Sequence, residues 1–149
     1  MDTEIRIRAV EETDFLQIVS LFKEFATFEK MPEQMTNSVE RMSKEKDFFH
    51  CFVAETKDKK IIGYATYFFC YYTWIGKSLY MDDLYVKPEY RANGIGTKLI
   101  NKVIQFAKDS ECNKLRWQVS DWNKPAIDFY THIGAKIDSN EHNCDLIFD

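Results

Sequence analysis

The sequence predicts a mixed α/β fold, with a mainly antiparallel central sheet and flanking helices. Two long apolar runs, 61–72 and 77–86, are separated only by residues 73–76, and so short a connection is typical of an antiparallel hairpin. An amphipathic stretch after Gly94 leads to another apolar run near residue 115, and a helix between two strands predicts a parallel crossover. We therefore expect a sheet that is antiparallel in its middle and parallel where the long helix crosses over.

The first part of the chain predicts one strand and two helices. Apolar and charged residues alternate over 5–9, as in a half-buried strand. Thr13 and Asp14 can cap the helix that follows, and Asn37 and Ser38 can cap a second, short helix. The first helix has an apolar face at a period of about 3.6 residues. This face consists of Phe15, Ile18, Val19, Phe22, Phe25 and Ala26.

The remainder of the chain predicts further strands and two further helices. The first of these helices opens at Gly94, and the second begins at Pro125 behind Asn123 and ends at Gly134. The strands are expected over 48–55, 61–72, 77–86, 115–119 and 146–148. The predicted order of elements is β-α-α-β-β-β-α-β-α-β.

Length and composition narrow the class of protein. The 149 residues suit one domain over 1–149 with a real hydrophobic core. A formal net charge of −4 argues against a nucleic-acid partner. The chain has no apolar run near the roughly 18 residues of a membrane-spanning helix, and its start lacks the features of a secretory signal. We therefore expect no membrane partner and a cytoplasmic location.

The four cysteines are expected to be reduced and structural. Cys51, Cys70, Cys112 and Cys144 form no C-x-x-C pair, and none lies at metal-ligand spacing from a histidine. Cys51 and Cys70 lie in strand-like apolar runs, where a thiol behaves as a small hydrophobic group. The sequence therefore predicts no metal site.

A glycine-containing loop before the long helix is the most informative segment. Backbone N–H groups at such a helix start, together with the helix dipole, favour a phosphate group, and glycine lets the backbone approach it closely. Arg91 can add a charge to a phosphate oxygen. The loop lacks the glycine spacing of a Walker A motif and of the dinucleotide fingerprint. The candidate phosphate-binding residues are Arg91, Ala92, Asn93, Gly94, Ile95, Gly96 and Thr97.

Together with a second motif, this loop resembles the GNAT acetyltransferase superfamily. The pattern R-x-x-G-x-G follows a strand, and W-N-x-P-A-x-x-F-Y begins about thirty residues later. The resemblance implies a splayed strand pair, acetyl-CoA as acetyl donor, and the coenzyme pyrophosphate on the loop above. It implies main-chain contacts to the pantetheine arm from Leu84, Tyr85 and Val86. It also places Asn123, Pro125, Ala126 and Tyr130 at the coenzyme.

Within the superfamily, the chain is most similar to the branch of spermidine/spermine and thialysine N-acetyltransferases. The similar segments are 28–34, 71–77, 80–83 and 121–123. This branch implies a small cationic amine as acceptor and a homodimer. The chain departs from the branch at Ala92, where glycine is usual, at Asp82, where glutamate is proposed as base, and in the tail at 141–143.

Acetyl transfer needs a neutral amine, whereas an alkyl amine with a pKa near ~10.4 arrives protonated. A carboxylate can attract the cation and accept its proton, commonly through water. We expect Asp82 to do so, on the strand face of Leu84 and Val86, with Asp83 on the opposite face. The residues expected around the amine are Phe28, Glu29, Glu33, Trp74, Asp82 and Asp83.

On the leaving-group side, a phenol near pKa ~10 can protonate a departing thiolate, and Tyr130 is the expected general acid. Periodicity by itself fits a core tyrosine equally well. The main-chain N–H of Leu84 is a candidate oxyanion donor.

Other functions remain open at this point. A non-catalytic acetyl-CoA-binding sensor or interaction module would keep the loop, and a protein or peptide N-acetyltransferase would need an open groove instead of a pocket walled by aromatic residues. A cysteine acyl-enzyme would need an adjacent histidine, which nothing in the sequence places beside Cys51 or Cys70.

Overall fold

A computed structural model of the protein describes residues 4–148. The chain divides into two compact units, the first ending at Gln118 and the second beginning at Val119. The first unit holds the sheet and three α-helices, and the second holds α4 (Lys124–His132). That the whole chain acts as one domain stays a prediction.

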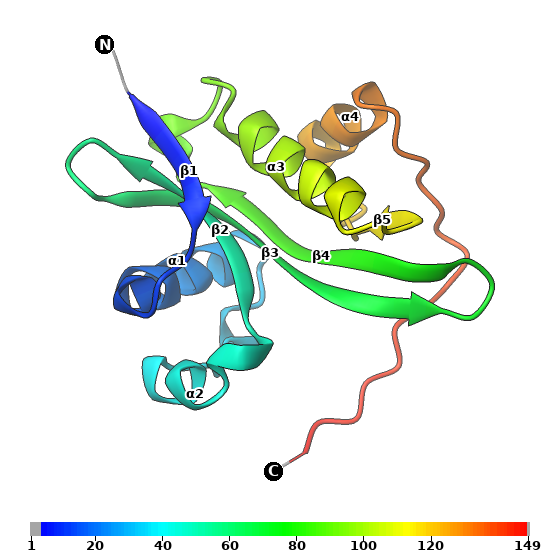
Figure 1. The fold of residues 1–149 in the computed structure, drawn as a ribbon, viewed down its shortest axis with the longest axis horizontal. Helices are drawn as coiled ribbons and strands as arrows, with labels where there is room; N and C mark the ends of the chain where they lie inside the picture. Colours follow the sequence, from blue (N-terminus) through cyan, green and yellow to red (C-terminus); the bar gives the residue numbers. More distant parts are fainter. Residues whose placement is uncertain (1–3, 149) are drawn as a thin grey trace. The chain divides into compact units, whose positions relative to one another are not determined.

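The first unit contains a five-stranded sheet whose strands lie side by side in sequence order (Figure 1). Its first four strands pair antiparallel, and the fifth pairs parallel with the fourth after the crossover through α3. The mixed sheet predicted from the sequence is confirmed. The strands are β1 (Ile5–Ala9), β2 (His50–Thr56), β3 (Ile61–Tyr72), β4 (Gly76–Val86) and β5 (Lys114–Arg116).

Helices cover both faces of this sheet (Figure 1). α1 (Phe15–Phe28) and α2 (Val39–Lys44) lie on one side, and α3 (Ile95–Asp109) lies on the other. The ring of Phe22 in α1 meets Tyr64 of β3, whereas Phe106 in α3 meets Tyr67 of the same strand. Because successive side chains of a strand point to opposite faces, these contacts place the two helices on opposite sides. Short 3-10 turns lie at Glu12–Asp14, Pro32–Gln34, Lys46–Phe48 and Pro88–Tyr90.

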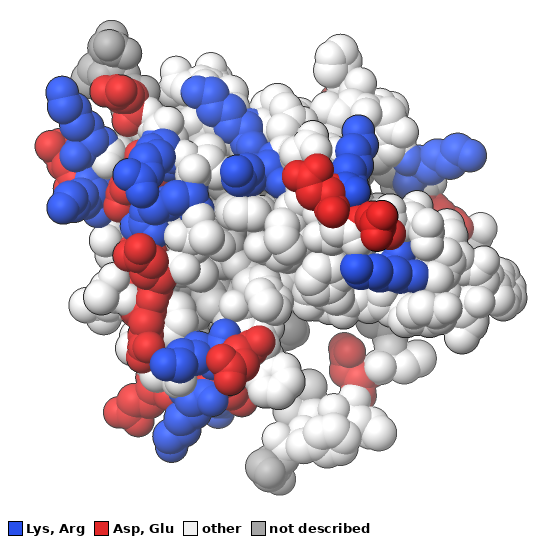
Figure 2. All heavy atoms as spheres, in the orientation of Figure 1, with Lys and Arg blue, Asp and Glu red and all other residues white. Residues whose placement is uncertain are grey.

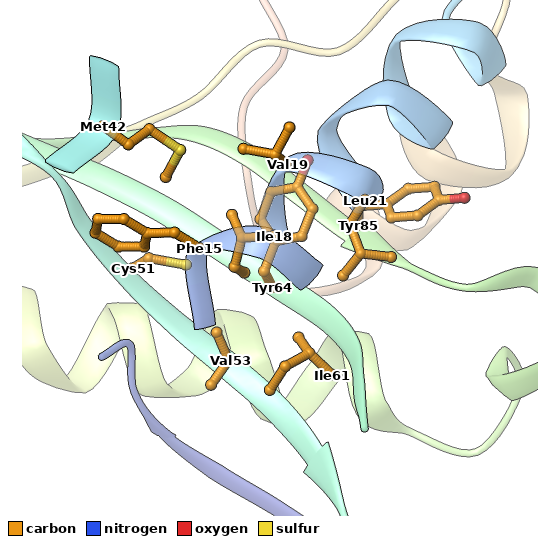
Figure 3. Packing of buried hydrophobic residues seen from close by; sticks show 10 residues of the cluster. All are labelled: Phe15, Ile18, Val19, Leu21, Met42, Cys51, Val53, Ile61, Tyr64 and Tyr85. Carbon is orange, nitrogen blue, oxygen red and sulfur yellow. The ribbon is translucent and has the colours of Figure 1, made fainter. Parts of the chain in front are cut away.

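The hydrophobic core on the α1 side includes two tyrosines, Tyr64 and Tyr85 (Figure 3). The Tyr64 ring meets Phe22 of α1 in a T-shaped contact, and the Tyr85 ring stacks on Phe25 of the same helix. The rest of the cluster is aliphatic or aromatic, apart from one buried thiol. Its other buried members are Phe15, Ile18, Val19, Leu21, Met42, Cys51, Val53 and Ile61.

The two predicted helix caps had different outcomes. Ser38 caps α2 as expected, because its hydroxyl accepts a hydrogen bond from the Arg41 N–H at 3.1 Å. Asp14 precedes α1 but does not cap it, so that prediction is wrong. Its carboxylate instead accepts hydrogen bonds from both terminal nitrogens of Arg8 and from the Glu11 N–H. A charged donor from β1 therefore outcompetes the helix N-terminus for this side chain.

β4 changes its pairing halfway along its length. β5 pairs with it only over residues 78–80, whereas β3 pairs with it down to Val86. The parallel neighbours therefore separate after Tyr80, as a splayed pair does.

A β-bulge interrupts β4 close to this point. Thr66 of β3 lies opposite Asp83, but the next residue, Tyr67, lies opposite Met81, so Asp82 is the extra residue. The bulge reverses the alternation of side chains. Tyr80 and Asp83, which simple alternation would place on opposite faces, share the α1 side. The predicted separation of Asp82 and Asp83 onto opposite faces assumed an unbroken alternation, which β4 does not have at Asp82.

The predicted last strand does not form. Residues 135–148 have no helix or strand in the described chain, and Leu146, Ile147 and Phe148 are 84%, 88% and 87% exposed. A strand needs a neighbour for its backbone groups, which apolar composition alone does not provide. By contrast, the predicted helix of the second unit is confirmed: Asn123 caps α4, and Gly134 follows its end with a φ of 96°.

None of the helices that the structure describes is long and apolar enough to cross a membrane. Figure 2 shows lysine and arginine side chains interspersed with aspartate and glutamate on the side that it draws.

Candidate active site

The loop between β4 and α3 has the backbone geometry that the sequence suggested. Gly94 adopts a left-handed conformation, with a φ of 76°, immediately before α3 begins at Ile95. The first hydrogen bond within the helix is donated by Lys98 N–H to the Gly94 carbonyl, so the preceding N–H groups have no intrahelical acceptor. The helix has no side-chain cap and no acid in its first turn. These features fit an anion such as a pyrophosphate.

Ala92 also adopts a left-handed conformation, with a φ of 66°. An L-residue with a side chain is strained there by about 1 kcal/mol or more, whereas glycine is not. Asn93 braces the loop, because its side-chain amide donates to the carbonyls of Tyr90 and Arg91 at 3.1 and 3.3 Å. The loop therefore keeps its shape with alanine at a position that favours glycine.

Arg91 is held by protein groups on two sides. Its Nε donates to the Val86 carbonyl at 2.8 Å. Its guanidinium lies over the rings of Phe28 and Tyr85, 5.0 and 5.4 Å from their centroids. Arg91 thus ties the start of the loop to the end of β4 and to the last residue of α1, which the sequence did not indicate.

The main chain of β4 presents its groups to two different edges. Lys87 N–H donates to the Ile62 carbonyl at 2.8 Å, and Tyr85 lies opposite Tyr64. Because the bonding direction alternates along an antiparallel pair, Tyr85 bonds toward β3, and Leu84 and Val86 direct their groups to the other edge. Leu84 thus suits main-chain contacts with a ligand, as does the N–H of Val86, whose carbonyl already accepts from Arg91, whereas Tyr85 does not.

A pair of carboxylates lies at the bulge where β4 loses its β5 neighbour. The Tyr64 hydroxyl donates to Asp83 Oδ2 at 3.2 Å, and the Asp83 N–H donates to the Thr66 hydroxyl at 3.0 Å. Asp83 is half-buried, whereas Asp82 reaches solvent. Among the described residues, neither aspartate forms a salt bridge.

This environment makes both carboxylates easier to protonate. Burial, together with the charges of Asp82 and Glu29, raises the pKa of Asp83 to about 7 against the opposing hydrogen bond from Tyr64. Partial desolvation also raises the pKa of Asp82. A carboxyl group with a pKa near neutrality can accept a proton at physiological pH.

Of the other residues expected around the amine, some lie near this pair and one does not. Glu29 caps the C-terminal end of α1 and acts electrostatically on Asp83. Glu33 is exposed in the turn after α1. Trp74 lies fully exposed in the β3–β4 turn, and β4 separates it from Asp83 by roughly 20 Å at about 3.3 Å per residue. The first unit by itself does not bring Trp74 to the carboxylates.

In the second unit, Asn123 and Tyr130 belong to α4. The Asn123 side chain accepts a hydrogen bond from the Ala126 N–H at 3.3 Å, so it acts as the helix cap. Tyr130 is buried, and its ring lies 5.4 Å from that of Phe129. Pro125 occupies the first turn of the helix.

The cysteines and the acidic residues offer no other reactive centre in the part of the chain that the structure describes. All four cysteines are free, and burial raises the pKa of the Cys51 thiol well above its usual range. No group of three or more potential metal ligands gathers among residues 4–148.

The splayed strand, the uncapped helix start and the carboxylate pair are compatible with an α/β acyltransferase whose donor carries phosphate groups. The chain belongs to the acetyltransferase (GNAT) family, whose sequence profile matches residues 15–135. It is thus an N-acetyltransferase, and the resemblance seen in the sequence is confirmed. The family uses acetyl-CoA.

Several known proteins are similar over nearly the whole chain. Thialysine N-epsilon-acetyltransferase of Sus scrofa is 41% identical over 89% of this chain and 84% of its own. Spermidine/spermine N(1)-acetyltransferase-like protein 1 of Homo sapiens is 33% identical over 95% of this chain but 22% of its own. In fold, the chain resembles the aminoglycoside N-acetyltransferase AAC(6')-Iy in complex with CoA. That structure has a TM-score of 0.72 at 16% identity and covers 100% of this chain and 95% of its own.

Two residues of the site were not identified from the sequence. Tyr64 and Thr66 hold Asp83 from the neighbouring strand. Polar groups at alternate positions of an otherwise apolar strand were the available signal. Their partner could not be named without the register of β3 against β4.

Proposed function

We propose that the protein transfers the acetyl group of acetyl-CoA to a small cationic amine, by direct attack in a ternary complex. The observation that carries this proposal is a pair of carboxylates without a cationic partner among the described residues, on the strand that leads into the anion-binding loop. Such a pair attracts an ammonium group and provides an acceptor for its proton.

For the donor, acetyl-CoA supplies an acyl group activated as a thioester. The N–H groups at the start of α3 would hold the pyrophosphate, with Gly94 allowing close approach. Leu84 and Val86 would bond the pantetheine arm through groups directed away from β3. The Leu84 N–H is the proposed oxyanion donor.

For the acceptor, we propose a compound with a primary amine on a flexible cationic chain, either a thialysine- or lysine-like amino acid or a diamine or polyamine. The activities by which the similar proteins are named support this class. Glu29 and Glu33 at the end of α1 would supply further negative charge for a second amine.

Coenzyme A release against a panel of amines tests this function. The panel would hold thialysine, lysine, ornithine, a short diamine, spermidine and an aminoglycoside, beside a reaction without amine. We expect release well above that control with at least one of the first five compounds. Release at the control rate with every amine, while calorimetry shows acetyl-CoA binding, would instead favour a non-catalytic coenzyme sensor.

The loop assignment predicts a charge-specific loss of acetyl-CoA affinity. Gly94→Asp places an anion beside the expected pyrophosphate, and we expect affinity to fall at least about tenfold, or about 1.4 kcal/mol. Gly94→Asn has a side chain of the same shape without the charge, and it tolerates a positive φ. Equal affinities of the two variants by calorimetry would contradict the assignment.

Tyr130 is proposed to protonate the thiolate as it leaves. Tyr130→Phe keeps the ring, so we expect kcat to fall about 10²-fold with an unchanged thermal midpoint. If the hydroxyl is only structural, stability should fall by roughly 1–3 kcal/mol with kcat preserved. Tyr71→Phe, which removes an exposed hydroxyl, is the control.

We further propose a homodimer in the cytoplasm. The β3–β4 hairpin exposes several large apolar side chains, and a second subunit is one means of covering them. They are Phe68, Phe69, Tyr71, Trp74 and Ile75. Light scattering on a size-exclusion column measures the mass, and a monomer at micromolar concentration would contradict the dimer.

A further inference from the structure

We infer that Asp83, positioned by Tyr64 at the β4 bulge, takes the proton from the attacking ammonium, and that Asp82 beside it tunes this step. The inference rests on the proposed acetyl transfer and assigns the proton differently from the sequence, which indicated Asp82.

The geometry distinguishes the two aspartates. Hydrogen bonds fix both the main chain and the side chain of Asp83: its N–H donates to the Thr66 hydroxyl, and its Oδ2 accepts a hydrogen bond from the Tyr64 hydroxyl. Tyr64 is itself immobilised in the core, fully buried and packed against the rings of Phe22 and Tyr85. One oxygen of Asp83, Oδ1, has no hydrogen-bond donor among the described residues.

Asp82 lacks this support. As the extra residue of the bulge, it has no partner opposite it on β3. Its side chain reaches solvent and accepts no hydrogen bond from the residues that the structure describes. A base held in one place transfers a proton more effectively than one free to rotate. Asp82 suits a different role, because its charge both attracts the ammonium and favours protonation of its neighbour.

The groups that face Asp83 come from each element packed around it. β4 contributes Asp82 and Tyr80, β3 contributes Tyr64, β2 contributes Cys51, and the end of α1 contributes Glu29. Each of these is either neutral or negative, and no lysine or arginine among residues 4–148 is a cause of the pKa shift of Asp83. Together with burial, this raises the pKa of Asp83 to about 7, so that the carboxylate binds a proton near neutral pH and can release it again.

Proton removal and acetyl transfer conserve atoms and charge. One N–H bond of the ammonium breaks, its electron pair stays on nitrogen, and an O–H bond forms on Asp83. The neutral nitrogen then attacks the acetyl carbon, a C–N bond forms, and the C–S bond breaks with its electron pair on sulfur. The nitrogen gives its second proton to solvent, Tyr130 protonates the sulfur and is reprotonated from solvent, and Asp83 returns its proton to solvent, so that one proton is released overall.

The pH dependence of kcat/KM in three variants tests the inference, because they shift the profile in different ways. Wild type should lose activity as pH falls below about 7, when Asp83 becomes protonated. Asp82→Asn removes a neighbouring negative charge and should move this limb to lower pH. Tyr64→Phe removes a hydrogen bond that favours the carboxylate and should move it to higher pH. Asp83→Asn should lower kcat/KM about 10²-fold and abolish the limb.

The outcomes separate this inference from the proposed function. If wild type releases no coenzyme A with any amine, the proposed function fails. If wild type is active but Asp83→Asn keeps the limb and Asp82→Asn abolishes it, Asp82 is the base and the inference is overturned. Carbon-13 NMR titration of the Asp83 carboxyl in the free protein adds a readout without turnover. A midpoint below pH 5, or one unchanged in Asp82→Asn, would also overturn it.

Discussion

Two groups of carboxylates in the first unit have opposite electrostatic settings. In the Arg8 cluster, Arg8 donates to Asp14 and Glu55, each at 2.8 Å, and the three side chains are 14%, 8% and 14% exposed. In the β4 pair, Asp82 and Asp83 form no salt bridge with any residue that the structure describes, and a tyrosine hydroxyl is the side-chain donor to Asp83. Both groups are at least partly removed from water, but only the first has a cation bonded to its carboxylates.

The difference is visible in their proton affinities. The hydrogen bonds from Arg8 lower the pKa values of Asp14 and Glu55, whereas burial raises those of Asp82 and Asp83. Paired carboxylates fasten β1 to the start of α1 and to β2. Carboxylates without a cation are less stable in their ionised form, and this makes them more ready to accept a proton. Buried acids in one protein can therefore be sorted by their partners into structural and chemical roles.

Breaking the Arg8 cluster should have the largest effect on stability. Arg8→Met keeps an unbranched apolar stem but leaves two carboxylates without their cation, and we expect a loss of about 3 kcal/mol. Lys46→Met is the matched control, since its ion pair with Glu12 is more than half exposed and should contribute at most about 0.5 kcal/mol. Denaturant unfolding measures both, and equal losses would show that the Arg8 cluster has no special importance.

The second and smaller expected effect is a loss of stability in acid, where the Arg8 cluster is weakened. The pKa values of Asp14 and Glu55 are lowered in the folded state. Their contribution to the free energy of unfolding is therefore present above the pKa values of the unfolded chain, near ~4, and is lost as the pH falls through the pKa values of the folded protein. The thermal midpoint of wild type should therefore decrease as the pH is lowered below about 4. In Arg8→Met this part of the pH dependence should be absent. The same acid slope in both proteins would contradict the explanation.

For the β4 pair, stability should depend on pH in the opposite direction, and this effect should be the smallest of the three. The pKa of Asp83 is raised to about 7, so its folded state binds the proton more tightly, and wild type loses stability as the pH rises from about 4 through 7. Asp83→Asn keeps an acceptor for Tyr64 without the charge. We expect it to be more stable than wild type at pH 8, on the order of 1–2 kcal/mol after allowance for partial exposure, and nearly equal at pH 5. A constant difference between the two pH values would contradict this.

Local patterns predicted most of the fold. The apolar period of α1 and the short 73–76 connection depend only on neighbouring residues, and both predictions were confirmed. Strand pairing depends on distant segments. For this reason the apolar run 146–148 was wrongly predicted as a strand. Asp14 was assigned to a cap because the sequence did not show that Arg8 of β1, which also bonds Glu55 of β2, would bind its carboxylate.

The site was predictable in position but not in detail. Gly94 identified the loop because a left-handed turn before a helix favours glycine. The sequence could not show that Arg91 bonds Val86 and stacks on Phe28, because a long flexible side chain has many acceptors within reach. Nor could it show which aspartate Tyr64 would bind, since that depends on the register of β3.

The extra residue in β4 has a consequence for comparing sequences in this region. Asp82 acts as a phase shift: inward and outward positions follow one parity before it and the opposite parity after it. Substitution tolerance along β4 should therefore follow two interleaved patterns that change over at this residue. A relative with one residue fewer between Tyr80 and Tyr85 would have a strand in a single phase, and its acidic side chains would have to reach the amine from a different part of the sheet.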